Sequence, residues 1–285
     1  MGNGGNDADA RVNDIKNKFV GYYSAESDLF GNNIDKPGLT GQSVMFHYIN
    51  FFKTCRIVEK LFLHGFSNLP EYRILDAGCG NGQDLRTLVE FGAKPENCHG
   101  IDFSEAALAA ARRMSPPEME FRQVPFLDNG YETGTFDIVF SYNTITNYPE
   151  DRDIMDIGAE FRRLLQPNGV LLLICTIDNT PKRAAGVAGL VARTFTMDDI
   201  KKFFPQFEIK DACSASVLKD NFEKNIVITD QLGNKANMGV LFNWGAKLQE
   251  QQSYNQFYVN GALKHLVYGM EIIKSGLKLL VLRPS

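Results

Sequence analysis

The glycine-rich segment Ile74–Gly82, with the sequence ILDAGCGNG, has residue types and spacing that fit a ligand site. Its glycines at positions 78, 80 and 82 let the backbone turn tightly and let a ligand approach without Cβ atoms. Asp76 lies beside the loop, and Asp102 follows roughly twenty residues past Gly82, where an acidic residue can bind both hydroxyl groups of a ribose. The segment therefore predicts a nucleoside site at the carboxyl ends of parallel strands.

The loop favours a nucleoside that carries an ammonium group and no phosphate. Its glycines follow the spacing GxGxG, whereas a dinucleotide loop has GxGxxG and directs its helix dipole at a pyrophosphate. The Asp76 carboxylate would repel phosphate but suits an ammonium group. S-adenosylmethionine has a ribose, an α-amino group and no phosphate. Together with Phe103, whose ring can lie on adenine, these residues indicate S-adenosylmethionine as the cofactor.

Four segments together resemble the class I S-adenosylmethionine-dependent methyltransferases. They are ILDAGCGNG, GIDFS with the Ala-rich stretch after it, TFDIVFS, and RRLLQPNGVLLL. The resemblance runs from about Arg73 to Ile177, and a last strand extends it. It implies an α/β, Rossmann-like, doubly wound sheet of seven mainly parallel strands with an antiparallel last strand. The stretch FGAKPENCHGIDFS is similar to bacterial methyltransferases of secondary-metabolite or surface-polysaccharide pathways.

The resemblance gives the matching residues roles in cofactor binding. Four residues of the loop would line the methionine part: Asp76, Gly78, Cys79 and Gly80. Asp102 would hold the ribose, and Phe103 would pack on adenine. Three residues after the fourth strand would pass beneath the sulfonium: Ser141, Tyr142 and Asn143.

The chain departs from the family after the third predicted strand. The family often places an acidic residue there, which bonds the adenine amino group, but this chain reads Phe121-Arg-Gln-Val-Pro-Phe126. Either Asp128 reaches back to the adenine, or backbone atoms of Val124 and Pro125 contact it. Arg56, on an apolar helix before the first strand, is a candidate partner for the methionine carboxylate, with a surface salt bridge as the alternative.

Methyl transfer to a protonated acceptor needs a general base, and three residues outside the core are candidates: His47, His265 and Tyr22. Tyr23 lies beside Tyr22, where the family's N-terminal segment often covers the cofactor. His64 and His99 are expected to be structural. No HExxH motif occurs, so no metal is expected.

The elements that position these residues alternate between strand and helix from Arg73 onward, which predicts parallel βαβ units. The expected strands are 73–77, 98–103, 120–124, 136–142, 170–177, 207–217 and 277–283. The expected helices are 83–91, one capped by Ser104 that runs to Met114, one around 154–165, and one capped by Thr196 that ends at Phe204. A helix with an apolar face that includes Ile57 and Leu61 precedes them and ends at Gly65.

The chain divides into a core and two additions. We expect disorder over 1–10, a helical cap segment over 11–70, the methyltransferase core over 71–217, an inserted cap subdomain over 218–276, and the last core strand over 277–285. Both additions are rich in aromatic residues. They are expected to meet over the carboxyl ends of the strands, with Tyr22, Tyr23 and His47 on one side and Trp244 and Tyr254 on the other.

This organisation favours a small-molecule acceptor, methylated at oxygen, nitrogen or carbon. A protein or RNA methyltransferase is the alternative, and it would need an open or basic face instead of an aromatic pocket. A non-catalytic protein that binds S-adenosylmethionine is a third hypothesis. A nicotinamide oxidoreductase is disfavoured by the GxGxG spacing.

Composition restricts the partners. The 285 residues carry a net charge of −4, and the pI of about 5.7 argues against broad binding of nucleic acid. The longest apolar run, Val170–Ile177, is shorter than the roughly 18 residues of a membrane helix. The first residues include no apolar stretch, so no signal peptide is expected. Five cysteines without a CxxC motif predict free thiols in a reducing compartment. We expect a cytoplasmic protein, with a homodimer as one oligomeric state that the sequence leaves open.

Overall fold

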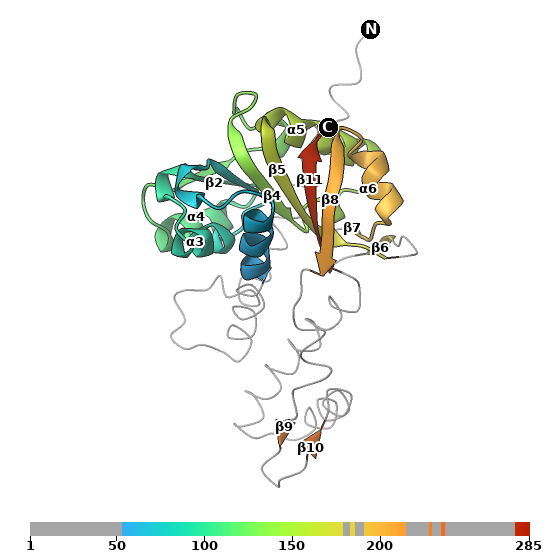
Figure 1. The fold of residues 1–285 in the computed structure, drawn as a ribbon, viewed down its shortest axis with the longest axis horizontal. Helices are drawn as coiled ribbons and strands as arrows, with labels where there is room; N and C mark the ends of the chain where they lie inside the picture. The colour runs from blue at the N-terminus through green and yellow to red at the C-terminus, as the bar shows by residue number, and fades with distance from the viewer. Residues whose placement is uncertain (1–52, 179–182, 186–190, 215–227, 230–234, 237–276) are drawn as a thin grey trace.

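The computed structural model describes residues 53–178, 183–185, 191–214, 228–229, 235–236 and 277–285 (Figure 1). A seven-stranded sheet in the order β3-β2-β1-β4-β5-β11-β8 forms its centre. The strands are β1 Ile74–Ala77, β2 Cys98–Asp102, β3 Glu120–Gln123, β4 Phe136–Tyr142, β5 Leu165–Thr176, β8 Phe207–Ser214 and β11 Leu277–Pro284.

The direction of the strands confirms the predicted fold class. The first five strands of the sheet pair in parallel, so that their carboxyl ends meet at one edge. Strand β11 runs antiparallel to both neighbours, β5 and β8. This is the doubly wound, Rossmann-like sheet with an antiparallel last strand that the sequence predicts.

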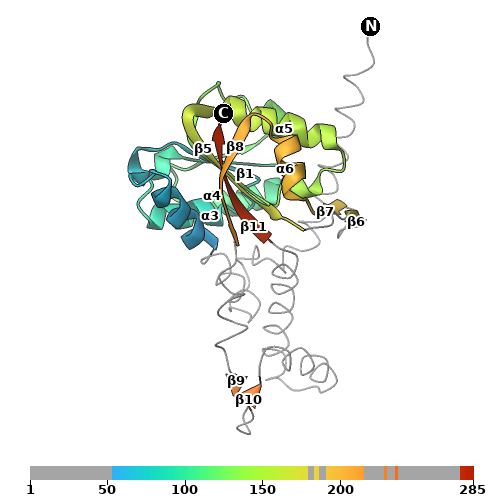
Figure 2. The same ribbon diagram turned by 45° about the vertical axis from the view of Figure 1, so that its right-hand side comes forward.

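Helices cover both faces of the sheet (Figure 2). They are a helix over 53–63, α3 Gln83–Glu90, α4 Glu105–Met114, α5 Asp151–Leu164 and α6 Met197–Phe203. The helix over 53–63 packs with α3 and α4 in one apolar core, and α5 and α6 pack in the other. Short 3₁₀ turns join the elements: η1 Leu69–Glu71, η2 Pro95–Asn97, η3 Phe126–Asp128 and η4 Ile145–Asn147.

The helix ends follow the predicted capping residues. The Ser104 hydroxyl accepts a hydrogen bond from the Ala107 N–H at 3.2 Å at the start of α4. Thr196 and Asp199 form the reciprocal capping box of α6, with Asp in the place usually taken by Glu. Gly65 terminates the helix over 53–63, two residues after its last helical residue. Its φ of +89° is a left-handed conformation that glycine adopts without steric cost.

Two small ladders and one longer strand differ from the predicted elements. Strand β5 begins at Leu165 instead of Val170, because Leu165 pairs with Phe136 before an irregularity in the register. The ladders are antiparallel pairs of strands: β6 Arg183–Ala185 with β7 Val191–Arg193, and β9 Ile228–Thr229 with β10 Lys235–Ala236. Their lengths of two or three residues are too short for a strand pattern in the sequence.

Several predicted residues lie outside the described part of the chain: Tyr22, Tyr23, His47, Trp244, Tyr254 and His265. Most of the two predicted cap segments lies outside it as well, so the predicted domain boundaries stay predictions. Within the described ranges, no helix is long and apolar enough to cross a membrane. The same residues include no cluster of metal-ligating side chains.

Candidate functional site

The glycine loop between β1 and α3 is held against the end of β2. The N–H groups of Gly78 and Cys79 both donate to the Ile101 carbonyl, at 2.9 and 3.0 Å. The next glycine, Gly80, donates its N–H to the Asp102 carboxylate at 2.9 Å. Gly78, Gly80 and Gly82 all have positive φ, which explains why the loop needs glycine at these positions.

Gly78 also lies against the segment that follows β4. A Cβ atom on Gly78 would be 2.3 Å from the Thr144 Oγ1 atom, far inside van der Waals contact. The Thr144 hydroxyl donates to the Ala77 carbonyl at 2.9 Å, and the buried Ser141 hydroxyl donates to the same carbonyl at 3.1 Å. Ser141, predicted to lie beneath the sulfonium, therefore joins β4 to the end of β1, and Thr144 is a contact that the sequence analysis missed.

Two carboxyl groups flank the loop, as the sequence predicts: the buried Asp76 and the half-buried Asp102. Asp102 accepts the Gly80 N–H on one oxygen and the Ser104 N–H, at 2.9 Å, on the other. Burial raises the pKa of Asp102. Asp76 is 2% exposed, and burial raises its pKa well above the usual range, with the like charges of Asp84 and Asp102 adding to the effect. An ammonium group that bound here would favour the ionised form of both carboxyl groups.

A buried ion pair joins the helix over 53–63 to the first turn of α3. The Lys53 Nζ atom lies 2.6 Å from an Asp84 oxygen, and the Thr54 hydroxyl donates to the other oxygen at 3.1 Å. Lys53 also lies over the Tyr142 ring, 3.9 Å from its centroid. The sequence analysis missed this pair, although Lys53 shares a helical stripe with the buried residues Ile57 and Leu61.

Asn143 holds the turn after β4 in an unusual conformation. Its φ is +53°, its N–H donates to the Ile174 carbonyl at 2.8 Å, and its own carbonyl accepts from Thr146 and Asn147. The side-chain oxygen of Asn143 is buried and has no hydrogen-bond partner among the described residues. Buried acceptors without a partner are uncommon in folded proteins, and this oxygen can accept a hydrogen bond from a bound group.

Strand β7 fastens the segment that follows this turn. The buried Arg193 donates from Nη2 to the Asp151 carboxylate at 2.9 Å and from Nη1 toward the Tyr148 and Pro149 carbonyls, at 3.5 and 3.4 Å. The hydrogen bond from Arg193 holds the pKa of Asp151 below its usual range. The start of α5 is therefore fixed relative to the end of β4.

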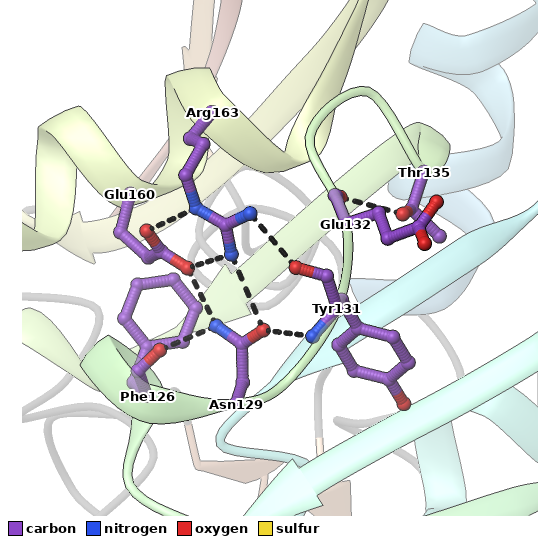
Figure 3. Close-up of polar contacts among 7 residues, drawn as sticks. All are labelled: Phe126, Asn129, Tyr131, Glu132, Thr135, Glu160 and Arg163. Atoms are coloured by element: carbon purple, nitrogen blue, oxygen red, sulfur yellow. Dashed lines mark hydrogen bonds and ion pairs between the residues drawn. The ribbon is translucent and has the colours of Figure 1, made fainter.

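The loop after β3, expected near adenine, is fixed by a polar network (Figure 3). Asn129 is buried and donates to the Phe126 carbonyl and to Glu160 on α5, both at 2.6 Å. Arg163 bonds both Glu160 oxygens, at 2.6 and 2.7 Å, and the Tyr131 carbonyl at 2.8 Å. The network holds η3 and the residues before it in place. It could not be predicted from the sequence, because the residues that form it come from a polar loop and a distant helix.

Val124 and Pro125 are half-buried at the start of this loop, whereas Asp128 is exposed. Phe103 is half-buried, and its carbonyl accepts from the Gln123 side chain at 3.0 Å. Asp128 and the backbone of Val124 and Pro125 therefore both stay predictions for the adenine contact.

Other predicted residues have partners away from the loop. Arg56 pairs with Glu59 at 2.5 Å on the surface of its own helix, in agreement with the surface salt bridge that was the alternative to a cofactor contact. His99 contacts Glu120 at 2.7 Å, and His64 contacts Asp211 at 3.4 Å, so both have structural partners as expected. All five cysteines are free thiols.

Comparison with known proteins supports a family assignment for the central part of the chain. Residues 74–169 match the family model described as "Methyltransferase domain". The sterol 24-C-methyltransferase erg6 of Schizosaccharomyces pombe is 25% identical over 169 residues, 56% of this chain and 42% of that protein. The geranyl diphosphate 2-C-methyltransferase of Saccharopolyspora erythraea is 33% identical over 105 residues, 35% of each chain. The chain thus spans less than half the length of these relatives.

A solved structure is similar in fold to this chain. The 1,6-didemethyltoxoflavin-N1-methyltransferase of Burkholderia thailandensis, crystallised with bound 1,6-didemethyltoxoflavin and S-adenosylhomocysteine, aligns with a TM-score of 0.59 at 14% identity. The alignment covers 100% of this chain and 92% of that one. Residues 74–169 are therefore similar to a methyltransferase domain, and the sheet that they help to form has the doubly wound, Rossmann-like strand order.

Proposed function

We propose that the protein is an S-adenosylmethionine-dependent methyltransferase that acts on a small-molecule acceptor. The observation that carries the proposal is the arrangement of two carboxyl groups at the glycine loop: the buried Asp76 on β1, and the half-buried Asp102, which accepts the Gly80 N–H. A ribose and an ammonium group, both parts of S-adenosylmethionine, match these two acceptors.

Three features of the site fit this cofactor. At the end of β1, the three glycines with positive φ leave the loop backbone without Cβ atoms at those positions, so a ligand can approach it closely. Asp102 is already oriented by the N–H groups of Gly80 and Ser104, so its position is set before a ribose binds. The buried, unpartnered oxygen of Asn143 supplies a further acceptor at the end of β4. The residues proposed to hold the cofactor are Asp76, Gly78, Cys79, Gly80, Asp102, Phe103, Val124, Pro125, Tyr142 and Asn143.

The chemistry that S-adenosylmethionine supplies is an in-line displacement at the methyl carbon of a sulfonium, whose leaving group needs no acid. The protein's task is therefore to align the two reactants and exclude water, and alignment can supply roughly 7–11 kcal/mol of the barrier. A base is required only when the acceptor atom carries a proton. His47, His265 and Tyr22 remain the proposed candidates for that base.

A small, partly apolar acceptor is supported by the names of the two curated relatives, which act on a sterol and on geranyl diphosphate. The aromatic segments around Tyr22 and Trp244 are proposed to enclose it. The net charge of −4 favours such an acceptor over RNA. A cytoplasmic location and a homodimeric state belong to the same proposal, and cell fractionation and sedimentation velocity test them.

Isothermal titration calorimetry with S-adenosylmethionine, S-adenosylhomocysteine and NAD tests the cofactor. We expect micromolar binding of the first two and none of NAD, whereas tight binding of NAD alone would overturn the proposal. Transfer of a labelled methyl group then tests the acceptor class. Label is expected on compounds from a small-molecule extract, and label found instead on RNA or on protein would contradict the proposed substrate class.

A further inference from the structure

The Lys53–Asp84 ion pair is a feature of the site that the proposed reaction does not explain. Lys53 and Asp84 have side-chain exposures of 5% and 11%, and 31 residues separate them in the sequence. Burying two charges costs several kcal/mol of desolvation, so a buried ion pair is weak evidence for a contribution to stability alone. The position of the pair suggests a role in binding.

The pair and Asp76 lie on the same face of the sheet, because Ile74, two residues before Asp76 on β1, packs in one apolar core with Ile57 of the helix over 53–63 and Leu85 of α3. Asp76 precedes the glycine loop by two residues, and Asp84 follows its last glycine, Gly82, by two. Each end of the loop therefore carries a buried carboxyl group. The charged groups that act on Asp76 are Asp84 from α3, Asp102 from β2 and Lys53 from the helix over 53–63. The Cys79 thiol lies in the same loop and stays protonated, because burial raises its pKa well above the usual range.

Lys53 is the single cation among the groups that act on Asp76 in the described part of the chain. Without it, three carboxyl groups would share a buried region, and repulsion would favour protonation of at least one. A protonated Asp76 cannot attract an ammonium group. Lys53 counters this by neutralising Asp84 at 2.6 Å, and its contact with the Tyr142 ring fixes where the charge lies.

We propose that Lys53 is a positioning residue for cofactor binding: through its ion pair with Asp84 it favours the ionised form of the neighbouring Asp76, the form that can bind the ammonium group of S-adenosylmethionine. The inference rests on the proposed function, because it takes Asp76 as the acceptor of that ammonium. Under this inference, the helix over 53–63 has an electrostatic role in the site, and Lys53 acts through Asp84 without direct contact with the cofactor.

The pH dependence of binding tests this role, since each variant shifts it in a defined direction. Binding of S-adenosylhomocysteine is measured by calorimetry between about pH 5 and about pH 9. In the wild type, affinity falls as the pH drops through the pKa of Asp76. Lys53→Met leaves Asp84 unneutralised and should move this midpoint upward. At a pH below the midpoint, a shift of one unit weakens binding about tenfold, and the loss disappears at high pH.

The two other variants of the pair separate charge from structure. Asp84→Asn removes the neighbouring negative charge while Lys53 remains, so the midpoint should move downward, opposite to Lys53→Met. The double variant Lys53→Met/Asp84→Asn removes one charge of each sign and should return the midpoint close to that of the wild type. Asp84→Asn also serves if Lys53→Met fails to fold, because it retains the cation and a hydrogen-bonding amide.

Lys60→Met is the matched control. Lys60 lies on the same helix and forms an ion pair of similar length, 2.7 Å, with Asp211 on β8. Its loss should leave the midpoint unchanged. Equal midpoints in all variants, or a double variant that binds as weakly as Lys53→Met at every pH, would overturn the inference. Wild-type protein that binds no S-adenosylhomocysteine at any pH would instead refute the proposed function.

Discussion

Replacing Gly78 with alanine should damage the glycine loop in a way that a second substitution repairs in part. Two effects add at this position. Gly78 has a φ of +89°, and a Cβ atom there would lie 2.3 Å from the Thr144 Oγ1 atom. The threonine side chain can move only by giving up its hydrogen bond to the Ala77 carbonyl. The substitution therefore combines backbone strain with overpacking at the contact between the loop and the segment after β4.

The magnitude follows from these two effects. An alanine in a left-handed conformation costs about 1–2 kcal/mol, and overpacking of a tight contact costs about 1–3 kcal/mol. Gly78→Ala should then lower the free energy of unfolding by about 2–5 kcal/mol. Thr144→Ala alone loses one hydrogen bond, about 0.5–1.5 kcal/mol. It also removes the atoms that a Cβ at Gly78 would touch, so the double variant should lose about 0.5–3 kcal/mol less than the sum of the single variants.

Urea unfolding followed by circular dichroism measures all four proteins. Gly134→Ala is the control for backbone strain, because Gly134 has a φ of +69° and no atom within 4 Å of the position of a Cβ. It should lose about 1–2 kcal/mol, the strain alone. Equal losses for Gly78→Ala and Gly134→Ala, or strictly additive losses for Gly78 and Thr144, would refute the contact that the structure places between the loop and Thr144.

Three further predictions concern other side chains. Asp102→Ala should weaken binding of S-adenosylmethionine roughly ten- to a hundredfold, because a charge-assisted hydrogen bond contributes about 1.5–3 kcal/mol, and an unchanged dissociation constant in calorimetry would contradict the ribose assignment. Asn129→Ala leaves buried partners without hydrogen bonds and should lower the unfolding free energy by about 1–3 kcal/mol; a loss near zero in urea unfolding would show that the network is dispensable. Asp151 has a lowered pKa, so the stability that it contributes is present above its ordinary pKa of about 3.9 and is lost as the pH falls through the lower folded value. Asp151→Asn should therefore flatten the acid limb of thermal stability below about pH 4, and an unaltered limb would contradict the assignment.

The fold was predictable because the sheet is buried on both faces. Strand β4 agrees with its predicted bounds at both ends, since an apolar run between turn residues leaves little freedom for its position. The capping residues Ser104 and Thr196 were also visible, because a cap is a local signal. The start of β5 was placed five residues late, at Val170 instead of Leu165, because Leu165 already pairs with β4 ahead of the polar Pro-Asn-Gly segment, and the regular ladder resumes only at Val170.

The site was predictable only where it depends on adjacent residues. The backbone bonds of Gly78 to Gly80 follow from the loop motif, and Asp102 from the end of the next strand. The partners of Lys53 and Asn129 could not be predicted, because a helical stripe indicates that a residue is buried but not which distant carboxylate it meets. Both pairs join residues about thirty positions apart in the sequence, and which of these residues come into contact depends on how the helices pack.

The place of β11 in the sheet has a consequence for the order in which the protein can be assembled. Residues 277–284 form an interior strand between β5 and β8, and in the described sheet β8 bonds to β11 alone. During synthesis, the strands from β1 to β5 emerge more than a hundred residues before β11 does. Until then, one side of β5 and the whole of β8 lack their hydrogen-bonded neighbour, and such unpaired edges are prone to association. The nascent chain therefore passes through a long interval in which the core is incomplete. During this interval the apolar edge of β5 is unpaired and open to binding by a chaperone.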